Sequence, residues 1–517
     1  MSPRKPLIAL ALLLGMCWAQ AHTLRVANQG DALSMDPHSL NETLQLSFTG
    51  NLYEPLVTRD RNLQIVPALA TAWRRVRPTV WSFTLRQGVV FHDGSVMTAD
   101  DVVFSLRRAM GEGSDLRSLT GMFKEVRQVG DRQVEIETFF PQPILPDAIT
   151  EVYIMNRAWC EANKAEHPVD RRKGTENTAS FKANGTGPFR LKERQPGSRT
   201  VLVRHAAYWA KTGGNVDEVV FTPIGNDATR VAAMLSGEID LMEPVPLQDV
   251  ERLKADPRLT VLQAPELRTV FLGMDQRRDE LLYASVKGKN PFKDRRVRQA
   301  FYQAIDIEAI RSQVMRGAAT PTALMMAPGV RGFEAALNQR LPYDPEAARR
   351  LMADAGYADG FELTMNCPND RYVNDARICQ AVAANLARIG VTVKLRAESK
   401  ATYLPRVLRR DTSFFLLAWT PTSHDAHNVF VSLMAEAGPF NLGGYRNPRV
   451  DELIPKIQRE TDPEVRAAQV REVNKIHQDD IGHIPLHQQG LAWAVRKNIE
   501  VVQFANNFMP FNSVVMK

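Results

Sequence analysis

The fold of this chain is decided by five consecutive segments: FELTMNC (residues 361–367), DARICQAVAANLARI (375–389), VTVKL (391–395), YLPRVLR (403–409) and SFFLLAW (413–419). The first, third and fifth are short apolar or alternating runs, which are typical of strands. The two segments between them have the length and apolar spacing of helices, and Gly390 ends the first of these. Repeated strand–helix–strand units build a mostly parallel sheet covered by helices, so we predict an α/β fold.

Similar signals occur elsewhere along the chain. Asp344-Pro345 and Asp462-Pro463 have the N-cap and first-turn residues that favour the start of a helix. Trp81–Leu85 alternates like a half-buried strand, and Thr98 to Asp101 resembles a capping box that opens a further helix. The N-terminal part is therefore predicted to mix strands with at least one helix.

Two loops follow strands of the predicted sheet, Pro368–Tyr372 and Thr420–His427. Ligands of open α/β sheets bind in loops beyond the carboxyl ends of the strands, so we predict a ligand site here. Arg371 can pair with a ligand carboxylate through its planar guanidinium group, or it is a solvated loop charge. Trp419 ends its strand and forms either a pocket wall or part of the core.

Histidines occur in two groups. His424 and Asp425 lie in the second loop with His427, and imidazole with carboxylate can bind several transition metals. A motif this short is weak evidence for a metal, so we expect His424 and Asp425 to contact an organic ligand and predict no bound metal. The second group is expected to have structural or surface roles: His477, His483 and His487.

Composition and missing motifs exclude several function classes. The 517 residues are 44% hydrophobic and 24% charged, which is typical of globular proteins. The net charge of +7 is spread along the chain, and no basic run interleaved with aromatic residues indicates nucleic-acid binding. The patterns G-x-x-x-x-G-K-[ST], H-E-x-x-H, G-x-S-x-G and C-x-x-C are all absent. We therefore predict a non-catalytic protein without a cofactor.

The N-terminus indicates export. Arg4 and Lys5 precede an apolar run at residues 7–14, and Ala19-Gln20-Ala21 follows it. This is the pattern of a signal peptide cleaved before His22, so residues 1–21 are predicted to be removed and the protein to be exported. The alternative is a membrane anchor, but the apolar run is too short to cross a bilayer.

Four cysteines are present, and cleavage would remove Cys17. In an oxidising compartment the close pair Cys367 and Cys379 is the expected disulfide, which leaves Cys160 as an odd thiol. The alternative is that Cys367 and Cys379 are two free, buried cysteines.

One motif resembles a known family. FHDGSVMTADDV, at residues 91–102, is similar to the F-x-D-G-x-x-x-T-A-x-D-V signature of the family 5 extracellular solute-binding proteins, the peptide/nickel/opine group of ABC importers. Further similar segments follow in the expected order across nearly the whole chain: ALATAW (68–73), GTGPF (185–189), NPFKDRRVRQA (290–300) and GYRNP (444–448).

The resemblance implies a two-lobed periplasmic binding protein fold of type II, with an extra subdomain and two crossing segments between the lobes. It implies closure of the lobes on a ligand and delivery to a membrane permease of an ABC transporter, by a protein that is expected to be a monomer. The predicted units are lobe I (residues 22–55, 187–268 and 488–517), the extra subdomain (56–186) and lobe II (269–487).

The resemblance also bears on the cargo. In peptide-binding members an Asp after the strand-ending Trp pairs with the peptide's amino group, and the aligned residue here is Thr422. Asp425 or Glu54 could replace it. The resemblance further places Asn441 and Tyr445 near the pocket, although core packing is an alternative role for Tyr445. A di- or oligopeptide is the predicted cargo. The alternatives are an opine-like conjugate, a saccharide or a metal chelate, or a chaperone-like or sensory protein without transport.

Overall fold

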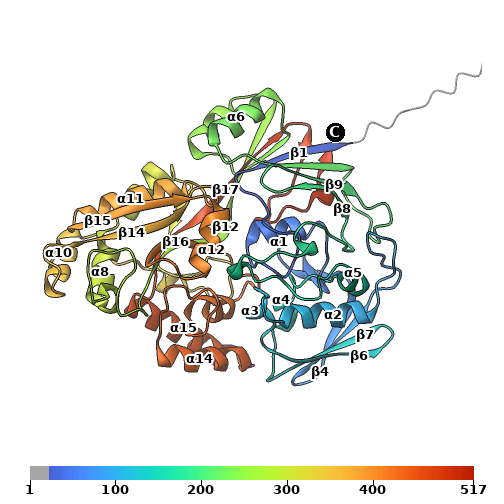
Figure 1. Ribbon diagram of the computed structural model, residues 1–517, viewed down its shortest axis with the longest axis horizontal. Coiled ribbons are helices and arrows are strands. Elements are labelled where there is room, and N and C mark those ends of the chain that lie inside the picture. Colours follow the sequence, from blue (N-terminus) through green and yellow to red (C-terminus); the bar gives the residue numbers. More distant parts are fainter. Residues whose placement is uncertain (1–21) are drawn as a thin grey trace, which may run out of the picture.

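The computed structural model describes residues 22–517. The predicted signal peptide, with Cys17, lies outside the described residues. One large sheet runs through the molecule and is divided between two lobes (Figure 1). Its strands, in spatial order, are β15 (Val391–Glu398), β14 (Phe361–Pro368), β16 (Phe414–Trp419), β12 (Leu259–Met274), β17 (Ile484–Arg496), β11 (Leu241–Glu243), β1 (Thr23–Asn28), β10 (Glu218–Pro223), β9 (Arg199–Arg204) and β8 (Phe189–Gln195), and β13 (Ala319–Pro321) pairs with β17.

The sheet is mixed, which corrects the expectation of a mostly parallel one. β14 pairs in parallel with β15 and β16, and β1 pairs in parallel with β10 and β11. Between these two groups, β12 and β17 pair antiparallel over most of their length. The chain leaves lobe I along β12 and returns along β17, so these crossing strands must run in opposite directions. Their register shifts between Pro265 and Thr269, near the level where the lobes meet.

Lobe II contains β14, β15 and β16, and lies to the left in Figure 1. Asp344 and Asp462 accept hydrogen bonds from the first turns of α10 (Pro345–Asp354) and α15 (Pro463–Asp480), as the sequence predicts. The helix predicted at 375–389 ends slightly earlier. The helices of this lobe are α8 (Arg295–Ala304), α9 (Ile307–Ala309), α10 (Pro345–Asp354), α11 (Asp375–Ala387), α12 (Lys400–Leu408), α13 (Ala426–Val429), α14 (Pro448–Arg459) and α15 (Pro463–Asp480).

Lobe I holds β1 and β8–β11, with a second sheet in the order β4 (Ala70–Arg77), β5 (Val80–Leu85), β7 (Gln133–Thr138) and β6 (Phe123–Gly130). The Thr98–Asp101 capping box is present: Asp101 Oδ2 accepts from the Thr98 backbone N–H at 2.8 Å. This capping box begins α2 (Ala99–Met110). The other helices of the lobe are α1 (Thr43–Thr49), α3 (Arg117–Thr120), α4 (Leu145–Ala148), α5 (Arg157–Ala162), α6 (Asp227–Ser236) and α7 (Val250–Lys254). Two short strand pairs complete it: β2 (Val57–Arg59) with β3 (Ile65–Pro67), and β18 (Ile499–Glu500) with β19 (Val515–Met516).

A disulfide joins Cys367, near the end of β14, to Cys379 in α11, so the predicted bridge is confirmed. It spans the loop that carries Arg371. Cys160 is buried and free. The exact limits of the lobes and of the subdomain stay predictions.

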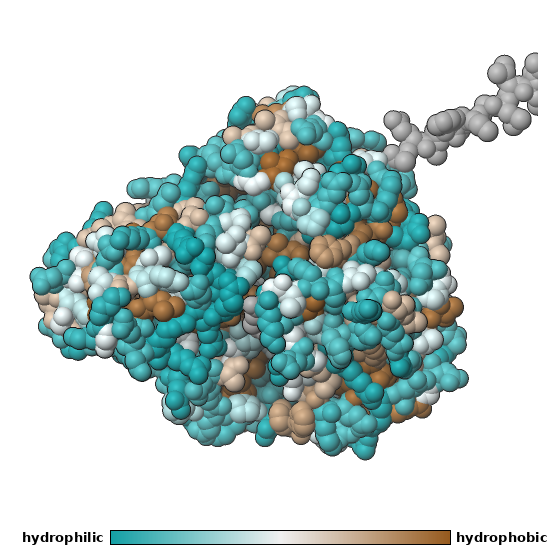
Figure 2. Space-filling view, viewed as in Figure 1, coloured by the Kyte–Doolittle hydropathy of each residue, from teal (hydrophilic) through white to brown (hydrophobic). Residues whose placement is uncertain are grey.

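The face drawn in Figure 2 is mostly hydrophilic, and its apolar residues are scattered among polar ones. Within residues 22–517, no helix has the length and apolar character needed to cross a bilayer.

Candidate functional site

A cavity lies where the two lobes meet. Lobe I contributes the start of α1 and the turn after α4, lobe II contributes the loops after β14 and β16, and the crossing strand β12 contributes Arg268. We call this the interlobe cavity. Its volume is about 50 Å³, and it shares Glu151, Asn506 and Phe508 with a cavity of about 280 Å³ in lobe I. The two cavities therefore form neighbouring parts of one hollow region.

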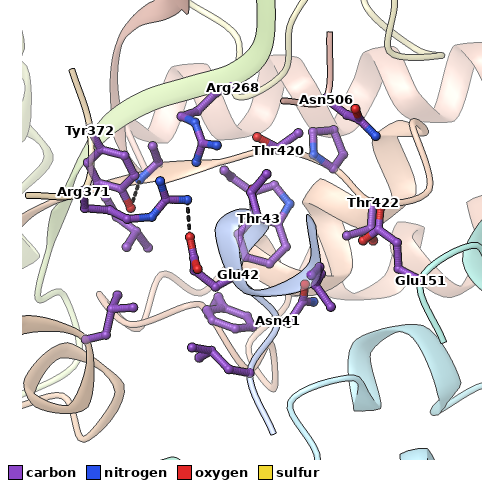
Figure 3. A pocket seen from close by; sticks show the side chains of 18 of the residues that line it. Asn41, Glu42, Thr43, Glu151, Arg268, Arg371, Tyr372, Thr420, Thr422 and Asn506 are labelled. Atoms are coloured by element: carbon purple, nitrogen blue, oxygen red, sulfur yellow. Dashed lines mark hydrogen bonds and ion pairs between the residues drawn. The ribbon is translucent and has the colours of Figure 1, made fainter. Parts of the chain in front are cut away.

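Glu42 connects the lobes through two ion pairs. It is the N-cap of α1, where it accepts hydrogen bonds from the backbone N–H groups of Leu44 and Gln45 at 3.1 and 2.9 Å. From lobe II, Arg371 Nη2 contacts Glu42 Oε1 (Figure 3), and Lys400 Nζ lies 3.1 Å from Glu42 Oε2. Burial alone would raise the pKa of Glu42, but the two cations and two backbone bonds lower it to about 2.

Arg268 projects into the same cavity (Figure 3). Its Nε donates a hydrogen bond to Glu266 Oε1 at 2.7 Å, and both residues are buried. The guanidinium carbons of Arg268 and Arg371 lie 5.7 and 5.1 Å from the ring centroid of Tyr372. Two guanidinium groups thus converge on one tyrosine at one side of the cavity.

Glu151, in the turn after α4, lies across the view from Arg371 in Figure 3. It is 4% exposed, and its Oε2 has no hydrogen-bond partner within the described protein. The cation that acts on it is Arg59, whose Nη2 pairs with Asp147 at 3.2 Å. Burial raises the pKa of Glu151 to about 8, and the charge of Arg59 opposes only part of that rise.

Other buried polar atoms of the cavity wall also lack a partner within the described part of the chain. Together with Glu151 Oε2 they include Asn41 Nδ2, Arg371 Nε, Thr420 Oγ1 and His424 Nε2. Buried polar groups in folded proteins are nearly always hydrogen-bonded, and an unpaired one costs about 1–3 kcal/mol. Such a set around one cavity is typical of a wall that binds a polar molecule.

Four of the seven predicted site residues line this cavity: Arg371, Trp419, Thr422 and His424. The ring of Trp419 lies 4.8 Å from that of Phe440, so this side chain belongs both to the wall and to the core. Thr422 Oγ1 accepts a hydrogen bond from Asn428 Nδ2 at 3.1 Å. The structure thus brings the two predicted loops to one place.

The other three residues lie outside the cavity lining. Asp425 begins α13 and pairs with Arg466 at 2.7 Å, so its carboxylate serves a helix end and an ion pair. The Asn441 side chain bonds the backbone of Tyr445 in both directions, at 2.7 and 2.9 Å. The Tyr445 hydroxyl donates to Asp480 at 2.8 Å. These contacts hold local loops and helix ends in place.

Glu54, the second carboxylate considered for an amino group, lines the lobe I cavity. Tyr208 and Thr186 hydroxyls donate to its two oxygens, each at 2.8 Å, and Trp209 Nε1 donates at 3.0 Å. Burial raises the pKa of Glu54 to about 7, although these three bonds lower it. Both carboxylate oxygens are therefore used within the protein.

Two histidines of the second group lie side by side, at ring centroids 5.2 Å apart. His477 and His483 share a hydrogen bond between Nε2 and Nδ1 at 2.9 Å, and both are buried. Burial lowers the pKa of His424 to about 3, which keeps its ring neutral. Among residues 22–517, no three His, Cys, Asp or Glu side chains are grouped to hold a metal ion.

Three residues of the cavity were missed from the sequence: Glu42, Glu151 and Arg268. One signal was available for Glu151, which stands as a single acid before the apolar run Val152–Met155. A charged residue in an apolar segment is expected to be buried, and a buried acid is expected at a functional site. Glu42 and Arg268 carry no comparable local signal.

The model of the bacterial extracellular solute-binding proteins, family 5, matches residues 64–441, which is most of the chain. This chain belongs to that family. The family assignment made from FHDGSVMTADDV is therefore confirmed. Members of this family bind ligands and work with the permeases of ABC importers.

Curated relatives of this family 5 protein match over nearly their full length. The chain is 23% identical to the glutathione-binding protein GsiB of Salmonella typhimurium over 490 residues, covering 92% of this chain and 90% of the relative. It is 26% identical to the dipeptide-binding protein of Escherichia coli over 450 residues, covering 80% and 79%.

A solved structure confirms the two-lobed fold. The periplasmic binding protein DppA of Helicobacter pylori, in complex with the peptide STSA, superposes with a TM-score of 0.86 at 23% identity. The match covers 96% of this chain and 98% of that one.

Proposed function

We propose that this chain is the periplasmic receptor of an ABC importer and that it captures a di- or oligopeptide between its lobes. Residues 1–21 would direct export and be cleaved, and the mature monomer would deliver its cargo to permease subunits in the inner membrane. No catalytic step is assigned to it. The observation that carries this proposal is the set of buried polar atoms around the interlobe cavity that have no partner within the described protein.

The charges around the cavity favour a cargo with both an anionic and a cationic group. On one side, Arg371 lines the cavity, and its buried Nε has no hydrogen-bond partner within the described residues, so it can donate to an anionic group. The opposite side carries Glu151 (Figure 3). A free peptide has a carboxylate at one end and an ammonium group at the other. The names of the dipeptide- and glutathione-binding relatives agree with this class of cargo.

The first test is native mass spectrometry of the mature protein purified gently from the periplasm, followed by identification of the released molecules. We expect a population of peptide masses bound one per monomer. A single non-peptide mass would contradict the peptide cargo but keep the receptor role. Loss of peptide uptake on deletion of the gene would support transport, and unchanged uptake with peptide still bound would contradict it.

A further inference from the structure

Glu151 is an acid of the interlobe cavity that forms no ion pair within residues 22–517. The other lining acid, Glu42, is paired with Arg371 and Lys400. Glu54, in the neighbouring cavity, receives three hydrogen bonds from protein side chains. Glu151 is as buried as either of them, yet its Oε2 has no partner within residues 22–517. A buried carboxyl without a partner is costly unless another molecule supplies one.

The nearby guanidinium group is committed elsewhere. Arg59 Nη1 donates to the carbonyl oxygen of Leu63 at 2.9 Å. Its Nη2 pairs with Asp147 and donates to the carbonyl oxygen of Ser423, both at 3.2 Å. These contacts tie Arg59 to its own hairpin, to α4 and to lobe II. Both Nη atoms are thus used by other partners, and Nε, which has no partner within the described residues, makes no hydrogen bond to Glu151.

The unpartnered polar atoms of the cavity wall indicate which chemical group could bind beside Glu151. Besides Glu151 Oε2, the unpartnered atoms that can accept a hydrogen bond are Thr420 Oγ1 and His424 Nε2, the latter when the proton is on Nδ1. A primary ammonium group has three N–H donors and no acceptor. The cavity wall thus offers unpartnered acceptors, one of them an acid, and a group that carries donors and a positive charge complements them.

We propose that Glu151 recognises a primary ammonium group of the cargo, so that this protein selects molecules with a free amine over the same molecules with that amine blocked. The inference rests on the proposed function and names the recognising residue of its site. Since Glu151 also lines the lobe I cavity, the group next to the ammonium can extend into that space of about 280 Å³.

The test compares the wild type with Glu151→Gln, which keeps the shape of the side chain and removes its charge. Each protein is equilibrated with a mixture of synthetic di- and tripeptides, and in parallel with the same mixture after N-terminal acetylation. Retained peptides are identified and quantified by mass spectrometry. We expect the wild type to prefer free amines, and Glu151→Gln to weaken their retention by about tenfold or more, since one partner of a buried charge pair is lost.

The matched control is Glu398→Gln, an acid at the end of β15 that lines neither cavity and accepts hydrogen bonds from Arg396 and Arg406. It should keep the preference for free amines. Melting temperatures of the cargo-free proteins separate the roles further. Glu398→Gln should melt below the wild type, because it removes the charge from a partly buried ion pair. Glu151→Gln should melt at or above the wild type, because it removes an unpartnered acid.

Equal retention of acetylated and free peptides, or unchanged retention by Glu151→Gln, would overturn the role of Glu151 and leave peptide binding intact. A wild type that retains neither mixture would overturn both the peptide cargo and this inference. A lower melting temperature of Glu151→Gln, with no change in selectivity, would assign Glu151 a purely structural role.

Discussion

Glu42 and Glu151 are two buried acids of one cavity whose pKa values move in opposite directions. Burial disfavours the ionised form of both. At Glu42, two cations and two backbone N–H groups outweigh burial, so its pKa falls to about 2. At Glu151 only the charge of Arg59 opposes burial, so its pKa rises to about 8. Glu42 thus acts as a fixed charge of the closed protein, whereas Glu151 changes its charge near neutral pH.

The raised pKa of Glu151 predicts a stability effect that needs no cargo. The folded protein holds this proton up to about pH 8, whereas the unfolded chain releases it near the ordinary value of 4.5. Between these values only the folded state binds the proton, so the contribution of Glu151 to the free energy of unfolding falls as pH rises. Relative to Glu151→Gln, the wild type should lose up to about 1.4 kcal/mol per pH unit across this window.

The measurement is urea unfolding of both proteins at intervals from pH 5 to pH 8.5. The difference in free energy of unfolding should grow with pH and level off above about pH 8. A difference that stays constant across the range would contradict the assigned pKa of Glu151.

Helices and strands were predictable where the signal is local. FELTMNC, SFFLLAW and the Asp-Pro helix starts give their elements through patterns within a few residues, and each is present. The order and direction of the strands were not predictable in this way, because pairing of β12 with β17 joins segments more than 200 residues apart. The strand-end rule selected the loops of Arg371 and His424 correctly as neighbours. Glu42 and Arg268 reach the cavity from other elements, and no local pattern indicates such contacts.

The disulfide should matter for the element that carries Arg371. It closes a loop with a sequence separation of 12 between β14 and α11. Restricting the unfolded chain over a loop of this length contributes about 3 kcal/mol. We expect the Cys367→Ala, Cys379→Ala double variant to lose about 2–3 kcal/mol in urea unfolding and to bind peptides more weakly, because the loop of Arg371 is less restrained.

Cys160→Ala provides the control, since it removes a buried thiol that forms no bridge. A reducing agent should destabilise the wild type and Cys160→Ala alike, and should leave the double variant unchanged. Equal stability of oxidised and reduced wild type would contradict a stabilising role for the bridge.

At the scale of the whole molecule, Glu42, Arg371 and Lys400 form an interlobe triad. All three are buried, with side chains 9%, 9% and 1% exposed. Burial lowers the pKa of Lys400, and only the pairing with Glu42 and Asp370 opposes this. When the lobes separate, water can solvate each charge. The triad therefore stabilises closure only while all its members are present.

Glu42→Gln should consequently shift the protein toward an open arrangement. When the lobes are closed, it leaves Arg371 and Lys400 near Asp370 but without the carboxylate that pairs with both, and breaking a buried pair costs about 3–5 kcal/mol. The Gln oxygen can still accept a bond at the start of α1. Small-angle scattering of the cargo-free variant should give a larger radius of gyration than the wild type. Peptide affinity should fall by about tenfold or more, since fewer molecules are in the closed, binding state.

Glu452→Gln is the matched control, because Glu452 pairs with Lys456 on the exposed face of α14, where such a pair contributes about 0–1 kcal/mol. It should leave scattering and affinity unchanged. Saturating peptide should return Glu42→Gln to the wild-type radius of gyration, because cargo that contacts both lobes adds its own binding energy to closure. If Glu42→Gln scatters like the wild type without cargo but still binds more weakly, Glu42 acts on the cargo directly, and closure is controlled by other contacts.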